Sequence, residues 1–357
     1  MRDVFRIFAR ASRSLTRRMC ACIGLVMAGT CEGDLEFWRD KTVLLTGASG
    51  FLGGWILREL LRQGAQVVAI VRQPRAQSQF ELAGFGARVT VVRGAAEDPE
   101  VLTTAFAAHR FFAVFHLASM VDVNAALRDP PAAMRASVET TLGILEQVRL
   151  RQPEAIVIVA SSDKAYGAQA TPFREDRPLE PQHPYEIAKA TQDLLAQSYG
   201  KLFGLKVGVT RCGNFFGGYD FAFARVIPYT IRQVLRGEAP VLRSDGSFTR
   251  DFLYVEEAAR AHLLLAERLA VDETLHGQAF NFSHEVAVPV IGLVRQIIAL
   301  MGAQVEPVIA GTAQAEIKDM LLDTTKARTR LGWRAEVDFA GGLERTIGWY
   351  SEFLRAG

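Results

Sequence analysis

The chain has 357 residues, of which 49% are hydrophobic and 22% charged, the balance expected of a globular protein with a substantial core. Its formal net charge of +2 provides no electrostatic basis for binding nucleic acid. No apolar run approaches the roughly 18 residues that span a bilayer, so we expect no membrane partner.

Residues 1–36 differ in composition from the rest and are predicted to be an N-terminal extension. Residues 1–30 carry six arginines and one aspartate, and a short apolar stretch covers 19–28. This pattern is typical of a targeting segment, but it also fits a start codon placed upstream of the true one, and both interpretations stay open. The remaining chain has one cysteine, Cys212, and therefore cannot form an internal disulfide. The lack of disulfides there is expected of a cytoplasmic protein.

From residue 37 onward, short apolar runs alternate with longer amphipathic ones. This alternation predicts βαβ units and a parallel sheet, hence an α/β fold of the Rossmann-type doubly wound class. Strands are expected at 42–45, 66–71, 88–92, 113–117, 155–161 and 206–211, and helices at 51–63, 100–107, 134–148 and 185–199.

The pattern changes after residue 214, where segments shorten and glycines and aromatic residues become frequent. We expect a dinucleotide-binding domain at 37–214, to which the chain returns over 249–283. Residues 215–248 and 284–357, with helices at 228–236 and 339–353, are predicted to form a smaller α+β lobe. Such a lobe would cover the carboxyl edge of the sheet, where doubly wound folds bind ligands.

A glycine-rich turn is predicted between the first strand and its helix. Residues 46–53 read Thr-Gly-Ala-Ser-Gly-Phe-Leu-Gly, so three glycines are spaced three apart. Glycines let the backbone turn tightly and approach a pyrophosphate, which the N–H groups of the helix N-terminus then bind. We therefore predict that a dinucleotide cofactor is held through Gly47, Ser49, Gly50, Phe51, Leu52 and Gly53.

The residue after the second strand reports on the ribose of the cofactor. An acidic residue here bonds the 2′-hydroxyl of NAD, whereas an arginine suits the 2′-phosphate of NADP. This chain has Arg72, with Arg75 close behind. The charge favours NADP, and the choice between the two cofactors stays open on these residues.

A tyrosine and a lysine four residues apart are the strongest catalytic signal. Tyr185 and Lys189 fall on one face of the helix predicted at 185–199. A nearby cation lowers the pKa of a phenol, which makes the tyrosine a usable acid or base near neutral pH. We predict that this pair moves a proton during hydride transfer to a nicotinamide.

These motifs resemble the extended short-chain dehydrogenase/reductase superfamily over almost the whole chain from residue 37. Within it, Phe37-Trp38 and residues 162–164 (Ser-Asp-Lys) are most similar to the sugar-nucleotide 4,6-dehydratases, and to the CDP-glucose branch in particular. The other shared motifs are His-Leu-Ala at 116–118, Arg-Cys-Gly-Asn at 211–214, Arg-Asp-Phe-Leu-Tyr-Val at 250–255 and Leu-Gly-Trp at 331–333.

The resemblance implies a tightly bound nicotinamide cofactor, NAD in the branch resembled. It places Leu117 and Ala118 against this cofactor, and it assigns Asn214, Arg225 and Arg250 to the diphosphate of a nucleotide-sugar substrate, because cationic and amide donors suit phosphate oxygens. A homodimer is also expected. We expect no metal, since the cysteines and histidines show no metal-ligand spacing.

Residues 162–164 distinguish between two reactions. A 4,6-dehydratase must remove a proton from C5 of the sugar and protonate the departing C6 hydroxyl, so it needs an acid and a base beyond the tyrosine and lysine. The resemblance implies that Ser162 bonds the C4 oxygen and that Asp163 is the acid. Lys164 stands where related dehydratases carry Glu and would act as the base or assist it.

Two other functions stay open. An NAD-dependent sugar-nucleotide 4-epimerase would use the same tyrosine, serine and lysine without an eliminating acid, and Asp163 argues against it. A nucleotide-sensing regulator on the same fold would have no turnover, but such proteins typically lack the tyrosine or the lysine. The sequence therefore predicts a 4,6-dehydratase that forms a 4-keto-6-deoxyhexose on its nucleoside diphosphate.

Overall fold

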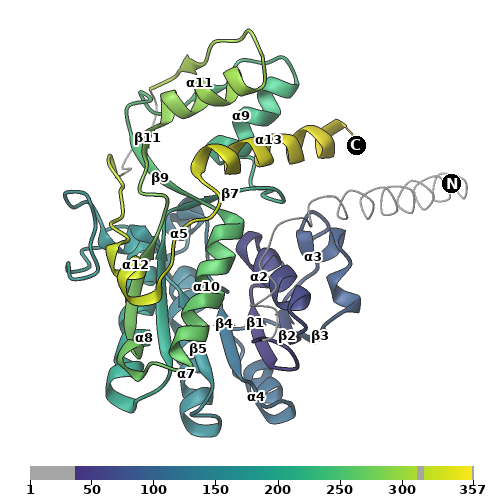
Figure 1. Ribbon diagram of the computed structural model, residues 1–357, viewed down its shortest axis with the longest axis vertical. Helices are drawn as coiled ribbons and strands as arrows, with labels where there is room; N and C mark the ends of the chain where they lie inside the picture. The colour runs from purple at the N-terminus through teal and green to yellow at the C-terminus, as the bar shows by residue number, and fades with distance from the viewer. Residues whose placement is uncertain (1–36, 312–316, 356–357) are drawn as a thin grey trace, which may run out of the picture.

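The computed structural model describes residues 37–311 and 317–355 (Figure 1). Within them, the centre is a parallel sheet of seven strands in the order β10-β6-β5-β4-β1-β2-β3, which confirms the predicted doubly wound fold. The strands are β1 (Thr42–Thr46), β2 (Gln66–Val71), β3 (Thr90–Arg93), β4 (Ala113–His116), β5 (Ile156–Ala160), β6 (Val207–Cys212) and β10 (Gln278–Phe282).

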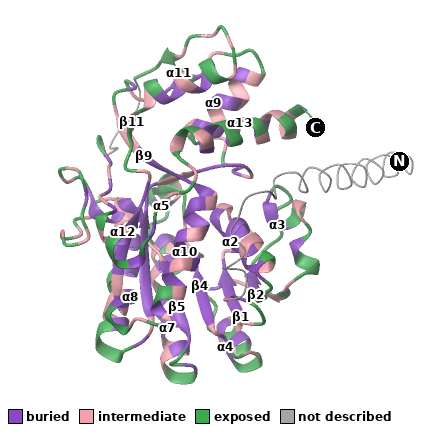
Figure 2. Cartoon of the chain, viewed as in Figure 1, coloured by how far each residue is buried: buried purple, intermediate pink, exposed green. Residues whose placement is uncertain are grey.

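Helices cover both faces of this sheet, because successive side chains of each strand point to opposite sides. Val43 and Leu45 of β1 face one core, and Leu44 between them faces the other. The first core is closed by α2 (Phe51–Arg62) and α10 (Val255–Leu269), and the second by α4 (Pro99–Ala108), α7 (Thr140–Arg151) and α8 (Pro184–Phe203). Figure 2 shows the resulting pattern of buried strands and exposed outer helix faces.

A smaller group of elements lies beyond the carboxyl ends of the central strands (Figure 1). Its core contains side chains of three helices and of a three-stranded sheet with the order β11-β9-β7. Beside it, β8 (Val241–Leu242) pairs with β12 (Val308–Ile309). The elements of the core are β7 (Asn214–Phe216), β9 (Thr249–Tyr254), β11 (Ala287–Pro289), α9 (Val226–Leu235), α11 (Val290–Leu300) and α13 (Phe339–Arg355).

The return of the chain to the central sheet begins later than residue 249. α10 packs against β5 and β6, and β10 pairs with β6, but β9 pairs with β7 and β11 of the small sheet. After that, α12 (Thr325–Leu331) packs against β10. The division into a dinucleotide-binding domain (37–214 and 249–283) and a smaller lobe (215–248 and 284–357) stays a prediction. By its pairing partners, β9 belongs to the sheet of the lobe.

The helix predicted at 134–148 is interrupted. It consists of the end of α6 (Pro130–Met134), a π-helical turn at Arg135–Glu139 and α7. The Thr140 hydroxyl donates to the carbonyl oxygen of Arg135, five residues earlier, at 3.3 Å. A hydroxyl that bonds a backbone carbonyl competes with the regular helical ladder, which accounts for the wider turn.

The remaining short elements are α3 (Gln79–Leu82), α5 (Val123–Arg128) and the 3-10 turns η1 (Phe85–Ala87), η3 (Asp163–Tyr166) and η4 (Glu273–Leu275). In the part of the chain that the structure describes, no helix combines the length and the apolar character needed to cross a membrane. The predicted extension at 1–36 lies outside the described residues.

Candidate active site

The glycine-rich turn joins β1 to α2 and has the geometry of a pyrophosphate cradle. Gly47 has a φ of 75°, and a Cβ added to Gly53 would lie 2.1 Å from the carbonyl oxygen of Gly47. Gly50 at the N-cap brings no side chain to the first turn of α2. The N–H groups of that turn therefore stay accessible to an anion, as binding of a dinucleotide requires. Ser49, Phe51 and Leu52 complete this turn and the start of α2.

The Thr46 hydroxyl connects the end of β4 to the glycine turn. It accepts hydrogen bonds from the backbone N–H groups of Leu117 and Ala118, both at 3.1 Å. The same hydroxyl lies 2.9 Å from Nδ1 of His116. Leu117 and Ala118 are thus held directly against Gly47, and their assignment to the cofactor stays a prediction.

His116 itself has a structural role that the sequence did not reveal. Its Nε2 lies 2.9 Å from the Thr141 hydroxyl on α7, so the ring bridges two threonines. Burial, together with the positive charge of Lys189, lowers the pKa of His116 to about 3. The ring is therefore neutral at physiological pH and can orient Thr46 without adding charge beside the glycine-rich turn.

Arg72 follows β2, and its side chain is 63% exposed. Its guanidinium lies 3.4 Å from the carboxylate of Glu97. An exposed ion pair of this length is weak, but it places a negative charge beside Arg72. The geometry thus reduces the electrostatic argument for NADP that Arg72 alone provides.

Tyr185 and Lys189 lie in the first turns of α8. Glu186 caps this helix by accepting from the backbone N–H of His183, and Pro184 occupies its first position. The Lys189 ammonium donates to the carbonyl oxygen of Ala160 at the end of β5, at 2.8 Å. This bond fixes the helix face that carries the pair against the carboxyl edge of the sheet.

Burial shifts the pKa of both groups. It raises the pKa of Tyr185 to about 12, a shift that the Ser162 hydroxyl and the charge of Arg225 partly offset. It lowers the pKa of Lys189 to about 8. At neutral pH the phenol is protonated and the lysine is still mostly charged. Any positive charge added near the phenol would bring it closer to use as a base.

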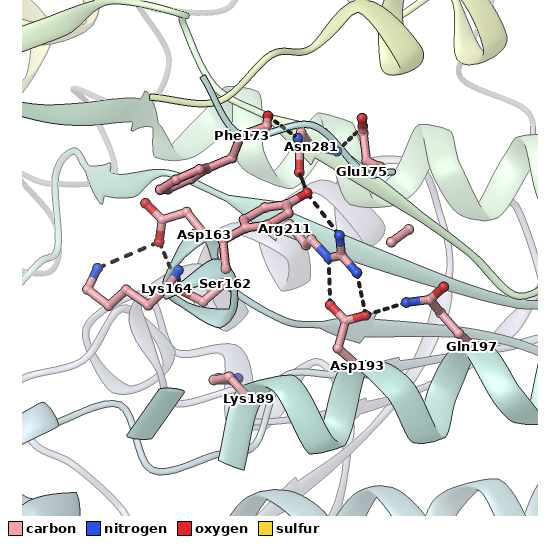
Figure 3. Close-up of polar contacts among 12 residues, drawn as sticks. Ser162, Asp163, Lys164, Phe173, Glu175, Lys189, Asp193, Gln197, Arg211 and Asn281 are labelled. Atoms are coloured by element: carbon pink, nitrogen blue, oxygen red, sulfur yellow. Dashed lines mark hydrogen bonds and ion pairs between the residues drawn. The ribbon is translucent and has the colours of Figure 1, made fainter. Parts of the chain in front are cut away.

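The residues predicted to drive elimination lie together after β5 (Figure 3). The Ser162 hydroxyl donates to Oδ1 of Asp163 at 2.9 Å, and Nζ of Lys164 lies 3.6 Å from the same oxygen. Asp163 is 1% exposed, and its Oδ2 has no hydrogen-bond partner among the described residues. Lys164 donates to Oδ1 of Asn214 on β7, at 3.1 Å. A buried carboxyl with one unpartnered oxygen is suited to receive a substrate hydroxyl.

The three residues that the resemblance assigns to the diphosphate lie at three different elements of the smaller lobe. Asn214 accepts a hydrogen bond from Lys164 and so lies beside the residues predicted to drive elimination. Arg225 begins α9, pairs with the buried Asp220 at 3.0 Å and lies 6.0 Å from the ring centroid of Phe51. Its charge therefore lies near both the cofactor turn and Tyr185. Arg250 lies on β9, where its Nη1 donates to the carbonyl oxygen of Thr249 at 2.9 Å.

Asp251 is a buried acid that the sequence interpretation missed. Its Oδ2 accepts from the backbone N–H of Leu322 at 2.9 Å, and its Oδ1 has no hydrogen-bond partner within the described residues. Burial, with a contribution from the charge of Asp163, raises the pKa of Asp251 to about 7. Residues 250–255 match a motif of the superfamily, but nothing in their spacing indicates a buried carboxyl.

A parallel sheet with a glycine cradle at its first turn, and a Tyr/Lys helix beside a serine, defines a nicotinamide-dependent enzyme of the short-chain dehydrogenase/reductase class. Residues 43–282, well over half of the chain, match the NAD dependent epimerase/dehydratase family, and the chain belongs to that family.

Two characterised relatives are dehydratases. The chain is 29% identical over 331 residues to dTDP-glucose 4,6-dehydratase of Xanthomonas campestris, covering 87% of this chain and 93% of the relative. It is 27% identical over 337 residues to CDP-glucose 4,6-dehydratase of Salmonella typhimurium, covering 90% and 94%. The predicted resemblance to this branch is confirmed at the level of the family.

Solved structures with the same fold include both reaction types. UDP-glucose 4-epimerase of Thermotoga maritima, with UDP-glucose, has a TM-score of 0.80 at 26% identity and covers 88% of this chain and 99% of its own. dTDP-glucose 4,6-dehydratase of Streptomyces venezuelae, with NAD bound, has a TM-score of 0.77 at 27% identity and covers 87% and 97%. The family relationship therefore extends to dehydration and epimerisation alike.

Proposed function

We propose that this protein is a sugar-nucleotide 4,6-dehydratase, which converts a nucleoside-diphosphate hexose into the 4-keto-6-deoxyhexose form. The observation that supports this proposal best is the position of Asp163. Its buried carboxyl is bonded to Ser162, the hydroxyl beside Tyr185, and one of its oxygens is left without a partner among the described residues. Elimination of the C6 hydroxyl requires an acid here, and epimerisation does not.

The pyrophosphate of the cofactor would bind at the glycine turn, and its nicotinamide would supply a hydride acceptor for C4 and then a hydride donor for C6. The side chains of the protein move the protons. Once the positive charge of the bound cofactor has lowered the pKa of its phenol, Tyr185 would take the proton of the C4 hydroxyl, while Ser162 bonds the C4 oxygen. The ketone acidifies the C5 hydrogen, which Lys164 takes or helps to take as a proton and which returns to C5 when the hydride adds to C6. Asp163 protonates the C6 hydroxyl as it leaves as water.

The reaction is tested by incubating the purified protein with CDP-, GDP-, UDP- and TDP-hexoses and measuring product masses. A dehydratase yields a product lighter by one water from at least one of them. Full conversion to an isomer of unchanged mass would contradict the proposal.

The second candidate is a sugar-nucleotide 4-epimerase. The observation in its favour is the close match to the Thermotoga maritima epimerase over 88% of this chain. Such an enzyme would use Tyr185, Lys189 and Ser162 as placed here and would leave Asp163 without a proton to transfer. A non-catalytic sensor is disfavoured, because the described site retains both the tyrosine and the lysine.

We propose NAD as the cofactor. Glu97 beside Arg72 opposes a 2′-phosphate, and the dehydratase of Streptomyces venezuelae was solved with NAD bound. Releasing the cofactor from denatured protein and separating NAD from NADP tests this directly. Mainly NADP would reverse the assignment.

We also propose a cytoplasmic homodimer. Exposed apolar side chains on two adjacent helices support the dimer, because such a surface is unfavourable in water. Leu142 of α7 is 41% exposed, and Leu194 and Phe203 of α8 are 56% and 52% exposed. Light scattering that gives the mass of one chain at micromolar concentration would contradict the dimer.

A further inference from the structure

A chain of buried polar side chains lies beside the proposed catalytic residues Ser162, Asp163 and Lys164 (Figure 3). Arg211 on β6 donates through Nε and Nη2 to the two carboxylate oxygens of Asp193 on α8, at 2.8 and 2.9 Å. Its Nη1 donates to the hydroxyl oxygen of Tyr166 at 2.9 Å. That hydroxyl in turn donates to Oδ1 of Asn281 on β10 at 2.8 Å. All four residues are at most 2% exposed. We call Asp193, Arg211, Tyr166 and Asn281 the Arg211 clamp.

One end of the clamp holds the helix of the proton-transfer pair. Tyr185, Lys189 and Asp193 are spaced four residues apart on α8, so they lie along one helix face. Asp193 follows Lys189 by one turn. The bidentate bond from Arg211 therefore fixes both the rotation and the height of the face that presents Tyr185, since such pairs constrain geometry in two directions.

The other end holds the turn that carries the acid. Tyr166 is the last residue of η3, and Asp163 is its first. Asp163 and Tyr166 are the two ends of one 3-10 turn, so an anchored Tyr166 side chain constrains the position of the turn that carries Asp163. The ring is held on two sides, by Phe173 at 5.0 Å between centroids and 26° between planes, and by the Arg211 guanidinium at 4.9 Å.

We infer that the Arg211 clamp positions the acid Asp163 relative to Tyr185, so that oxidation at C4 and elimination across C5–C6 occur on one bound substrate. The inference rests on the proposed dehydratase function. The four residues of the Arg211 clamp are positioning residues, which act through η3 and α8. A buried ion pair of this kind is often replaceable by apolar side chains without loss of stability, so its directional geometry is the property that needs an explanation.

Tyr166→Phe tests the clamp with the smallest change. It keeps the ring between Phe173 and Arg211 and removes only the hydroxyl, with its two hydrogen bonds. The rate of oxidation at C4 should stay within about threefold of wild type. The bond between Arg211 and Asp193 remains and still holds α8, the helix that carries Tyr185. Elimination should slow by about 10-fold or more, since a misplaced reacting group costs up to about 10²-fold. Reduced nicotinamide should then accumulate in a single turnover with the hexose that the wild type dehydrates.

Tyr199→Phe is the matched control. Tyr199 also lies on α8 and donates to a carboxylate oxygen, Oε1 of Glu146 at 2.7 Å, but outside the clamp. This variant should show wild-type rates for both steps. Phe173→Leu is a second variant, which removes the ring stacked on Tyr166 and spares the hydrogen bonds of its hydroxyl. It should shift the balance of the two steps in the same direction as Tyr166→Phe.

The outcomes separate the clamp from the proposed function. If the wild type dehydrates its substrate and neither Tyr166→Phe nor Phe173→Leu accumulates reduced cofactor, the clamp is overturned and the dehydratase proposal stands. Equal slowing of both steps in Tyr166→Phe also overturns it, because a merely structural role has that effect. A wild type that never removes water from any of the four nucleotide-hexoses overturns the function, and this inference with it.

Discussion

Asp163 and Tyr185 share one hydroxyl, that of Ser162, and yet they would act on different carbons of the sugar. The phenol has its pKa raised by burial, while the carboxyl offers an oxygen that nothing in the described structure occupies. Because the two groups would act in different steps, a substitution of Asp163 should slow elimination without slowing oxidation at C4.

We predict that Asp163→Asn blocks elimination and leaves oxidation at C4 in place. The amide keeps the shape and the bond to Ser162 but cannot protonate the C6 hydroxyl, so this step should slow by about 10²-fold or more. Because hydride cannot return to C6 before water leaves, reduced nicotinamide should accumulate, which its absorbance reveals in a single turnover.

Tyr185→Phe is the control for this experiment. It should abolish oxidation itself, with a loss of about 10²-fold or more and no reduced cofactor. If Asp163→Asn neither accumulates reduced cofactor nor loses activity, the acid is not Asp163 and the epimerase becomes the better assignment.

Asp251 couples the stability of the fold to pH. Its carboxyl is buried, and its folded-state pKa is raised to about 7 from an ordinary value of 3.8. Between these two values the folded state keeps a proton that the unfolded chain has released. The folded state thus binds more protons in this window, and the contribution of Asp251 to stability falls as the pH rises through it.

We predict that Asp251→Asn equals the wild type in stability near pH 4 and exceeds it above pH 7, by about 2–4 kcal/mol at 1.36 kcal/mol per pKa unit. Denaturant unfolding across this pH range measures the difference. Asp323→Asn is the control with the opposite sign, because a hydrogen bond with Thr325 lowers the pKa of Asp323. That variant should be less stable at neutral pH, with the gap closing in acid. A pH-independent Asp251→Asn difference would contradict the prediction.

Local motifs explain why part of the site was predictable. Tyr185 and Lys189, and the three glycines, sit within single elements, so their spacing alone predicts their geometry. Asp251 and the pair Arg211–Asp193 acquire their roles from contacts between distant segments. Asp193 meets Arg211 only because α8 packs against β6. The spacing of these residues along the sequence does not predict such a contact.

At the scale of elements, the approach of α2 to the turn after β1 leaves no room for a side chain at Gly53. The Cβ that Gly53 lacks would overlap the Gly47 carbonyl oxygen at 2.1 Å, and both partners are backbone. Neither can move without opening the turn. The close approach of α2 to β1 thus depends on this one missing atom.

We predict that Gly53→Ala loses most of its bound cofactor, by about 10-fold or more, because the N-terminus of α2 must shift away from the pyrophosphate. The nicotinamide content of purified protein measures this. Gly292→Ala in α11 is the matched control, since a Cβ there meets nothing within 4 Å, and it should keep full content. Equal content in both variants would show that the turn is not the cofactor cradle.

The strands of the central sheet were predictable because each is a short apolar run between turn residues, from β1 through β6. The small sheet was not. β7 and β11 have three residues each, too few to show an alternating pattern, and they pair with segments far along the chain. The position of β9 follows from these partners and not from its own composition.

At the scale of the whole molecule, the first described residues anchor the base of the fold. Trp38 is fully buried, and its Nε1 donates to Oε1 of Glu267 on α10 at 2.7 Å. Its ring also packs against Phe112 and Phe115 at 5.9 and 5.6 Å between centroids. One side chain thus joins the segment before β1 to β4 and to a helix more than 200 residues later.

We predict that a chain beginning at Glu36 folds and turns over like the full chain, because the Arg-rich residues before it offer nothing to the predicted core. A chain beginning at Asp40 should differ, since it lacks Trp38. Losing a buried tryptophan costs about 3–5 kcal/mol, enough to lower the unfolding midpoint in urea clearly. Midpoint, cofactor content and turnover of the three chains are compared side by side. If the chain from Glu36 is insoluble or inactive while the full chain is soluble and active, the extension contributes to the fold. Equal midpoints for the chains from Glu36 and Asp40 would show that Trp38 does not anchor it.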